Sequence, residues 1–118
     1  MPNKVVHFEI VGNDAKKSQE FYRALFGWTV DADNEYNYGM VDPKETGIGG
    51  GIGGGVGGPS HATFYVEVDD LQATLDQAER LGGKTRMPPD DVAGVTIAQF
   101  EDPDGVIIGL IKSGGATS

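Results

Sequence analysis

A chain of 118 residues fits one compact domain of roughly 100–150 residues, and its lack of cysteine excludes disulfides, a thiol nucleophile and a zinc–thiolate site. The formal net charge of -9, from 9 Lys and Arg against 18 Asp and Glu, opposes binding to nucleic acid and to anionic membranes. Because the sequence has neither an apolar run of about 20 residues nor a secretory signal, we expect a cytoplasmic protein with no membrane partner.

The first half of the chain begins with an alternating pattern. Phe8 and Ile10 lie on one face of the first predicted strand, and His7 and Glu9 lie on the other. This first strand covers residues 4–11. The patterns that follow predict a helix at 14–26 and then strands at 28–32 and 36–41. The apolar face expected for the helix consists of Phe21, Tyr22, Leu25 and Phe26.

A glycine-rich stretch at 47–58 follows, with nine glycines in twelve residues. A phosphate-binding loop would need a helix after it, whereas this stretch leads through Pro59 into a strand. The remaining alternatives are an extended edge strand with a connector, a backbone that approaches a ligand closely, and a hinge for exchanging modules between two chains. We favour a connector that also forms a pocket wall.

The second half repeats the first with an offset of 56 residues. The repeat pairs Phe8 with Phe64, Ile10 with Val66, Asp14 with Asp70, Leu25 with Leu81 and Gly27 with Gly83. It predicts a strand at 62–68, a helix at 70–81 and strands at 84–87, 95–100 and 106–112. We therefore expect a single domain of two βαβββ modules, about 1–58 and 59–114, with a disordered tail at 115–118.

Two residue types mark the expected helix ends. Asp14 and Asp70 stand where a carboxylate can accept the free N–H groups of the first turn. Gly27 and Gly83 follow the helices, where glycine tolerates a left-handed backbone.

Candidate site residues lie on the strand faces opposite the helices. His7 and Glu9 occupy this face in the first module, and a carboxylate there is costly unless it is solvated, paired or bound to a ligand. The same face of the second module carries His61, Thr63 and Tyr65. Further candidate pocket walls are Trp28 and one face of the 36–41 strand with Tyr36, Tyr38 and Met40, although core packing is the alternative for these aromatic residues.

Three segments together resemble the vicinal oxygen chelate superfamily, which includes glyoxalase I, bleomycin-resistance proteins and extradiol dioxygenases. The first is His7-Phe8-Glu9-Ile10 with the segment Phe21-Tyr22-Arg23-Ala24-Leu25-Phe26-Gly27-Trp28. The others are 64–71 and the Asp102-Pro103-Asp104-Gly105 turn before a closing apolar strand. The resemblance implies an α+β fold in which two βαβββ modules form a cupped mixed sheet, and it implies a homodimer.

Members of the superfamily hold a divalent metal on their first and last strands. His7 matches a usual ligand, but Thr63 and Gly109 stand at two other ligand positions. A relocated set of His7, Glu9 and His61, with or without Glu101, is the alternative. Glu9 lies two residues after His7 and His61 lies two before Thr63, and a shift of two residues moves a side chain by about 6–7 Å along a strand, more than the ~2 Å of a metal–ligand distance. We therefore predict no metal site and no cofactor, with a divalent metal as the alternative.

Two functions follow from the resemblance, and the sequence leaves open whether the protein is an enzyme. The favoured one is a glyoxalase-like small-molecule-binding protein with its pocket on the concave sheet face and no usual metal site. The alternative is a metal-dependent lyase or isomerase related to lactoylglutathione lyase, with Glu9 as the catalytic base. The predicted substrate-binding residues are His7, Glu9, Trp28, Tyr38, Met40, His61, Thr63 and Tyr65.

Overall fold

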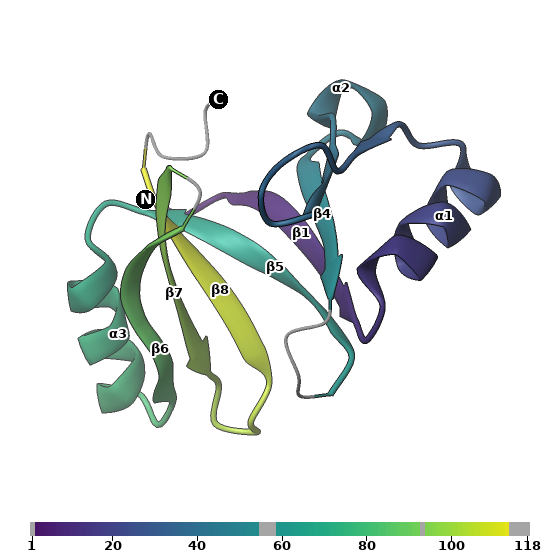
Figure 1. The fold of residues 1–118 in the computed structure, drawn as a ribbon. Helices are drawn as coiled ribbons and strands as arrows, with labels where there is room; N and C mark the ends of the chain where they lie inside the picture. The colour runs from purple at the N-terminus through teal and green to yellow at the C-terminus, as the bar shows by residue number, and fades with distance from the viewer. Residues whose placement is uncertain (1, 55–58, 93, 114–118) are drawn as a thin grey trace. The chain divides into compact units, whose positions relative to one another are not determined.

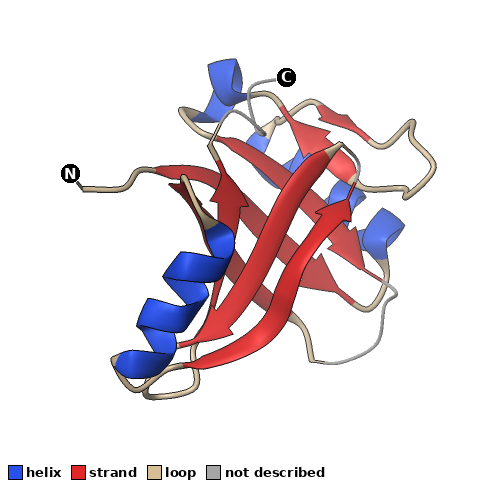
Figure 2. Cartoon of the chain, turned by 90° about the vertical axis from the view of Figure 1, so that its left-hand side faces the viewer, coloured by secondary structure: helices blue, strands red, loops and turns tan. Residues whose placement is uncertain are grey.

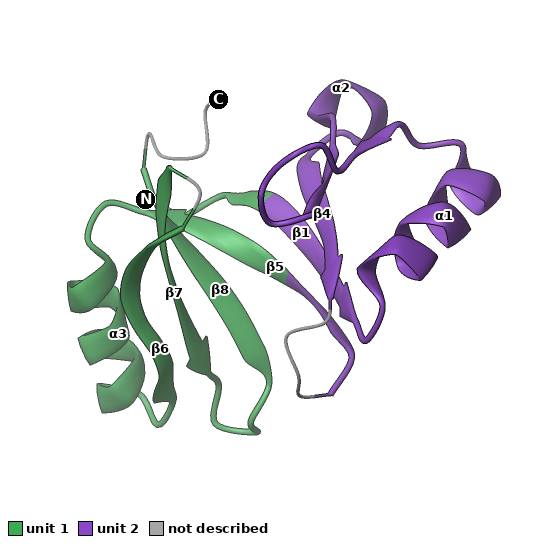
Figure 3. Cartoon of the chain, in the orientation of Figure 1, with its two compact units in different colours: residues 1–6, 64–118 green, residues 7–63 purple. Residues whose placement is uncertain are grey.

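The computed structural model describes residues 2–54, 59–92 and 94–113. The chain divides into two compact units, one of residues 7–63 and one of residues 1–6 with 64–118 (Figure 3). They are called here the 7–63 unit and the 64–118 unit. The predicted tail at 115–118 lies outside the described residues, and the predicted module boundaries stay predictions.

The 7–63 unit forms a mixed sheet with a helix on one of its faces (Figure 1). Its strands lie in the order β2-β3-β4-β1, with β1 parallel to β4 and β3 antiparallel to both β2 and β4. Two residues of β1 belong to the other unit. The elements are β1 (Val5–Gly12), α1 (Ala15–Phe26), β2 (Val30–Asp31), β3 (Gly39–Val41), α2 (Pro43–Thr46) and β4 (Gly49–Gly54).

The 64–118 unit repeats this plan, with its strands in the order β5-β8-β7-β6 and β5 parallel to β8. Figure 2 draws these strands red and the helices blue. The predicted α+β fold with two βαβββ modules is confirmed, and the short helix α2 is an addition that the sequence patterns did not predict. The elements are β5 (His61–Val68), α3 (Leu71–Arg80), β6 (Lys84–Val92), β7 (Val95–Glu101) and β8 (Ile107–Lys112).

The helix ends follow the sequence with one correction. Asp14 accepts the Lys17 N–H at 3.2 Å, and Asp70 caps α3 in the same way. Gly27 ends α1 with a φ of 72°. After α3, however, the left-handed residue is Gly82 with a φ of 102°, because Leu81 is the cap and the turn opens one residue earlier than predicted.

Glycine in β4 serves close packing inside the sheet. β4 lies between β1 and β3, so the expectation of an edge strand is wrong. A Cβ on Gly50 would overlap the ring of Phe8, and one on Gly51 would overlap the ring of Tyr38. The bare strand thus lets an aromatic ring lie against each of its faces. Residues 55–58 of the glycine-rich stretch lie outside the described residues.

The core of the 7–63 unit lies between the sheet and α1. Val30, Val41 and Ile52 are buried there. Side chains packed against them are Phe8, Ile10, Tyr22 and Trp28. The predicted apolar face of α1 is correct only for Tyr22, since three of its four members are more than half exposed: Phe21, Leu25 and Phe26.

The core of the 64–118 unit forms where α3 packs on its strands. Leu75 is fully buried in this core. Val66 packs against this core. Phe64, which the repeat pairs with Phe8, is instead 40% exposed, so the repeat does not predict burial at position 64. The other buried members are Val68, Leu71, Ala98 and Leu110.

Three strands differ from their predicted extents by three residues or more, and the one expected at 28–32 is reduced to Val30–Asp31. The strand expected at 36–41 is reduced to Gly39–Val41, because Asn37 has a left-handed φ of 51° and turns the chain. β6 continues to Val92, beyond the predicted end at residue 87, with irregular register. None of the helices in the described part of the chain is long and apolar enough to span a membrane.

Candidate functional site

The sheet face opposite α1 carries the predicted site of the 7–63 unit. Glu9 pairs with Gly51, and Gly51 pairs with Met40 across β1, β4 and β3. Since directly paired residues point to the same side of a sheet, this row shares one face, and Phe8 and Ile10 share the other. Asp31 extends the row on β2 and adds a second carboxylate to it.

Tyr38 joins His7 to Glu9 on this face. Its hydroxyl donates to Glu9 Oε2 at 2.9 Å and lies 3.0 Å from His7 Nε2. The rings of Tyr38 and His7 are stacked, with centroids 6.3 Å apart and planes 18° apart. All three side chains are partly buried. The structure therefore brings three of the predicted substrate-binding residues into one hydrogen-bonded set.

The hydrogen bonds assign the proton on His7. Tyr38 has one hydroxyl proton, which it gives to Glu9, so the contact with His7 requires the imidazole to donate from Nε2. Burial lowers the pKa of His7 from its usual value of 6.5, and the ring is therefore neutral at pH 7. A neutral imidazole, a phenol and a carboxylate in series form a polar group that can both donate and accept.

Glycine makes this set possible. The ring of Tyr38 fills the space that a side chain on Gly51 would take, and it also reaches Gly53, where a Cβ would come within 3.0 Å of Tyr38 Cδ1. The pocket wall predicted for the glycine-rich stretch stays a prediction, and the sequence did not indicate that Gly51 is the residue beneath the ring of Tyr38. Strand alternation could have placed Gly51 on this face, but no local pattern indicates the ring above it.

The other predicted residues have different surroundings. Met40 lies in the same row as Glu9 and is 47% exposed. Trp28 packs against Phe8, Tyr22 and Phe26 in the aromatic part of the core. These contacts match core packing, the alternative to a pocket wall. Its part in ligand binding stays a prediction.

The residues predicted on β5 are largely buried. Thr63 and Tyr65 are 8% and 4% exposed. His61 is partly buried, and its Nδ1 lies 3.2 Å from the carbonyl oxygen of Pro59. Their roles as ligand contacts stay predictions.

Comparisons with known proteins agree with this fold. Residues 4–110 match the model of the Glyoxalase/Bleomycin resistance protein/Dioxygenase superfamily. The chain belongs to this superfamily. The resemblance to the vicinal oxygen chelate superfamily is thereby confirmed at the level of the family.

Two curated relatives of this glyoxalase-superfamily chain are similar over almost all of its length. It is 29% identical to the probable lactoylglutathione lyase of Vibrio cholerae serotype O1, over 94% of this chain and 91% of that protein. It is 28% identical to the anthracycline biosynthesis protein DnrV of Streptomyces peucetius, over 96% of this chain. The chain spans only 48% of the length of DnrV.

Solved structures show the same fold at low identity. The hypothetical protein BH1468 from Bacillus halodurans has a TM-score of 0.72 and 11% identity, with 100% of this chain and 99% of that one covered. The methylmalonyl-CoA epimerase of Streptomyces coelicolor has a TM-score of 0.65 and 17% identity, with the same coverage.

The residues at the superfamily's metal-ligand positions do not fit a divalent metal. Gly109 has no side chain, and a Cβ there would overlap the ring of Tyr65, whose hydroxyl accepts from Gln99 Nε2 at 3.2 Å. Thr63 offers only a hydroxyl, and His7 Nε2 is bonded to Tyr38. The 64–118 unit thus has a tyrosine ring where a carboxylate ligand would have to lie.

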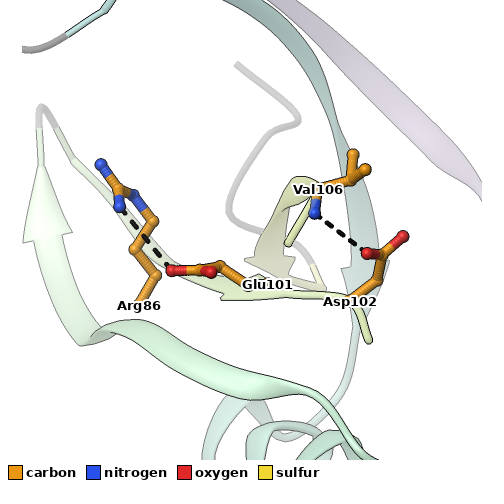
Figure 4. A network of polar contacts seen from close by, with 4 residues as sticks. All are labelled: Arg86, Glu101, Asp102 and Val106. Atoms are coloured by element: carbon orange, nitrogen blue, oxygen red, sulfur yellow. Dashed lines mark hydrogen bonds and ion pairs between the residues drawn. The ribbon is translucent and has the colours of Figure 1, made fainter. Parts of the chain in front are cut away.

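The relocated metal site is not assembled either. Over residues 2–54, 59–92 and 94–113, no three His, Cys, Asp or Glu side chains are grouped so that they could hold a metal ion. Glu101 instead forms an ion pair with Arg86, with 3.9 Å between Oε2 and Nη1 (Figure 4). His7, Glu9 and His61 are thus not grouped as metal ligands within the part of the chain that the structure describes.

The Asp102-Pro103-Asp104-Gly105 segment forms a turn that is held by hydrogen bonds to a side chain. Asp102 Oδ1 accepts the N–H group of Asp104 at 2.9 Å. It also accepts the N–H group of Val106 at 2.9 Å (Figure 4). Gly105 closes the turn with a φ of 86°. The carboxylate of Asp102 therefore stabilises the turn before β8.

Proposed function

We propose that the protein binds a small molecule on the sheet face of the 7–63 unit opposite α1, without chelating it through a metal. The observation that carries this proposal is the hydrogen-bonded set of His7, Tyr38 and Glu9. Titratable side chains gathered on one partly exposed sheet face are typical of binding sites. Membership of the glyoxalase superfamily supports the same proposal.

The chemistry of this face favours a ligand with an apolar or aromatic body and a positive or hydrogen-donating group. Met40 offers exposed apolar surface, and the stacked rings of Tyr38 and His7 offer a flat aromatic one. Glu9 and Asp31 make the face acidic, with His7 neutral at pH 7. An anionic ligand would meet two carboxylates on the row that they share.

A pair of probes tests the proposal. The chain is dialysed against a chelator and titrated with 1-naphthylmethylamine and, separately, 1-naphthoic acid, with binding followed by protein-observed NMR. We expect the amine to bind at least about tenfold more tightly than the acid, a difference of about 1.4 kcal/mol. The largest signal changes should belong to His7, Tyr38 and Met40.

Glu9→Gln removes the charge while keeping the shape, so it should abolish the preference for the amine. Glu20→Gln is the matched control, because Glu20 is exposed on α1. The proposal fails if the two probes bind equally, or if both variants keep the preference of the wild type.

A second candidate is a lyase or isomerase in which Glu9 moves a proton. The specific observation in its favour is that Tyr38 links the Glu9 carboxylate to the His7 imidazole, a chain of groups suited to holding and passing a proton. The Vibrio cholerae relative, named a probable lactoylglutathione lyase, supports this candidate at 29% identity.

Proton exchange at carbon separates the two candidates. S-lactoylglutathione and methylmalonyl-CoA are incubated with the chelator-treated chain in D2O, and loss of the C–H signal is followed by proton NMR. Enzyme-dependent exchange that disappears in Glu9→Gln and persists in Glu20→Gln would favour the enzyme. Absence of exchange with retained binding of the amine would favour the binding protein. The cytoplasmic location and the homodimer stay predictions from sequence.

A further inference from the structure

The segment 34–38 between β2 and β3 determines where Tyr38 lies. Tyr38 immediately precedes the first residue of β3 and therefore lies outside the strand. Asn37 before it adopts a left-handed conformation with a φ of 51°, which is uncommon outside glycine. A conformation of this kind persists only where surrounding contacts hold it.

Asn34 makes the first set of such contacts, from within the segment. Its Oδ1 accepts the N–H groups of Tyr36 at 3.1 Å and Tyr38 at 3.0 Å. Its Nδ2 donates to the carbonyl oxygen of Tyr38 at 2.8 Å. One amide side chain therefore bonds both the N–H and the C=O of the residue that enters the candidate site.

Gln19 makes the second set from α1. Its Nε2 donates to the carbonyl oxygen of Asn37 at 2.9 Å and to that of Ile52 on β4 at 2.8 Å. These two bonds use both amide hydrogens, and the side chain is only 4% exposed. A Cβ on Gly39 would lie 3.0 Å from Nε2, so glycine there gives the amide its room. Gln19 thus ties the segment to the same strand over which the ring of Tyr38 lies.

We propose that Gln19 and Asn34 are positioning residues that fix the hydroxyl of Tyr38 between His7 and Glu9. The functional meaning of this role rests on the proposed ligand site, whereas the geometry can be tested without any ligand. Asn34 sets the backbone of Tyr38, and Gln19 sets the distance of the segment from β4. Asn34 acts directly on the backbone of Tyr38, and Gln19 acts on the carbonyl oxygen of the preceding residue.

NMR of the protein alone gives the test. The chain has two histidines, so the ring protons of His7 are readily followed, with those of His61 as an internal control. The variants are Gln19→Leu, which keeps the volume and removes both donors, and Asn34→Ala. The measured quantity is the intensity of the crosspeaks between the ring protons of His7 and Tyr38 in a nuclear Overhauser spectrum.

We expect each variant to lose at least half of this intensity while the signals of His61 stay in place. Gln72→Leu is the control, because it removes an exposed glutamine on α3 whose amide donates to Asp76. A purely structural role would lower the unfolding midpoint and leave the His7–Tyr38 crosspeaks unchanged, which would overturn the proposal. If Gln19→Leu does not fold, Asn34→Ala decides alone, since its side chain is exposed.

The outcome is separable from that of the ligand experiment. Loss of the crosspeaks together with no probe binding by the wild type would uphold the positioning role and reject the proposed function. Unchanged crosspeaks in a chain that binds the amine would reject the positioning role and leave the proposed function standing.

Discussion

Replacing Gly51 by alanine tests whether the glycine run in β4 exists to seat Tyr38. A Cβ at position 51 would overlap Cζ, Cε2 and the hydroxyl oxygen of the Tyr38 ring. The backbone of β4 is held between β1 and β3, so the ring must yield rather than the strand. Gly51→Ala should therefore expel Tyr38 from its position between His7 and Glu9.

The expected destabilisation follows from the hydrogen bonds of Tyr38 to Glu9 and His7, which would break. A hydrogen bond to a carboxylate contributes about 1.5–3 kcal/mol, and one to a neutral group about 0.5–1.5 kcal/mol. Alanine in place of glycine recovers about 0.4–1 kcal/mol by restricting the unfolded chain. These terms lower the free energy of unfolding by about 1–4 kcal/mol, and the middle of that range, about 2.5 kcal/mol, corresponds to a drop of roughly 10 °C in the unfolding midpoint.

Urea unfolding of the wild type, Gly51→Ala and Gly49→Ala measures this difference. Gly49 is the matched control, because it lies on the same strand and face, and a Cβ there makes an ordinary contact of 3.5 Å with Pro43. Gly49→Ala should be neutral or slightly stabilising. In a Tyr38→Ala background the cost of Gly51→Ala should largely disappear. Equal stability of the two glycine variants, within about 0.5 kcal/mol, would refute the reasoning.

Three further predictions concern other parts of the chain. Gly109→Ala should lower the free energy of unfolding by about 2 kcal/mol in urea, because its Cβ would overlap the buried ring of Tyr65. Burial lowers the pKa of His7 from 6.5, so the unfolded chain binds more protons than the folded chain below that pH. The wild type should therefore lose stability as the pH falls below about 6.5, and His7→Gln should lack this loss. Urea titrations from about pH 5 to 8 measure the difference. Asp70→Ala should lower the thermal midpoint by removing a cap worth about 1 kcal/mol, since Asp70 accepts the Ala73 N–H at 2.9 Å.

Much of the candidate site could be predicted from strand periodicity. Alternation along β1 separates His7 and Glu9 from Phe8, and the structure keeps that separation. Tyr38 was also predicted, but for the wrong reason, because the expected strand at 36–41 does not extend back to it. Its position depends on a left-handed Asn37, and single-sequence patterns give little sign of such a turn.

The residues that hold the site were harder to find. Gln19 interrupts the side of α1 that faces the sheet, and a polar residue in that position is a usable signal of a buried hydrogen bond. Phe21, Leu25 and Phe26 obscured it by suggesting a different buried face. Asn34 is typical of a turn, but its presence does not indicate which residue the turn places in the candidate site.

The sequence alone determined the fold class. The repeated spacing of strand faces, helix caps and turn glycines is local information, so it can be read without knowing which strands pair with each other. It also indicated that the usual metal ligands are missing, since residue type at positions such as 63 and 109 can be read directly. Only the tertiary structure decided that tyrosine rings lie over Gly51 and Gly109 and that Tyr38 bridges His7 and Glu9. A glycine in the sequence shows that a position has no side chain. Which ring occupies the space beside it depends on the pairing of strands far apart in the chain, and periodicity does not specify that pairing.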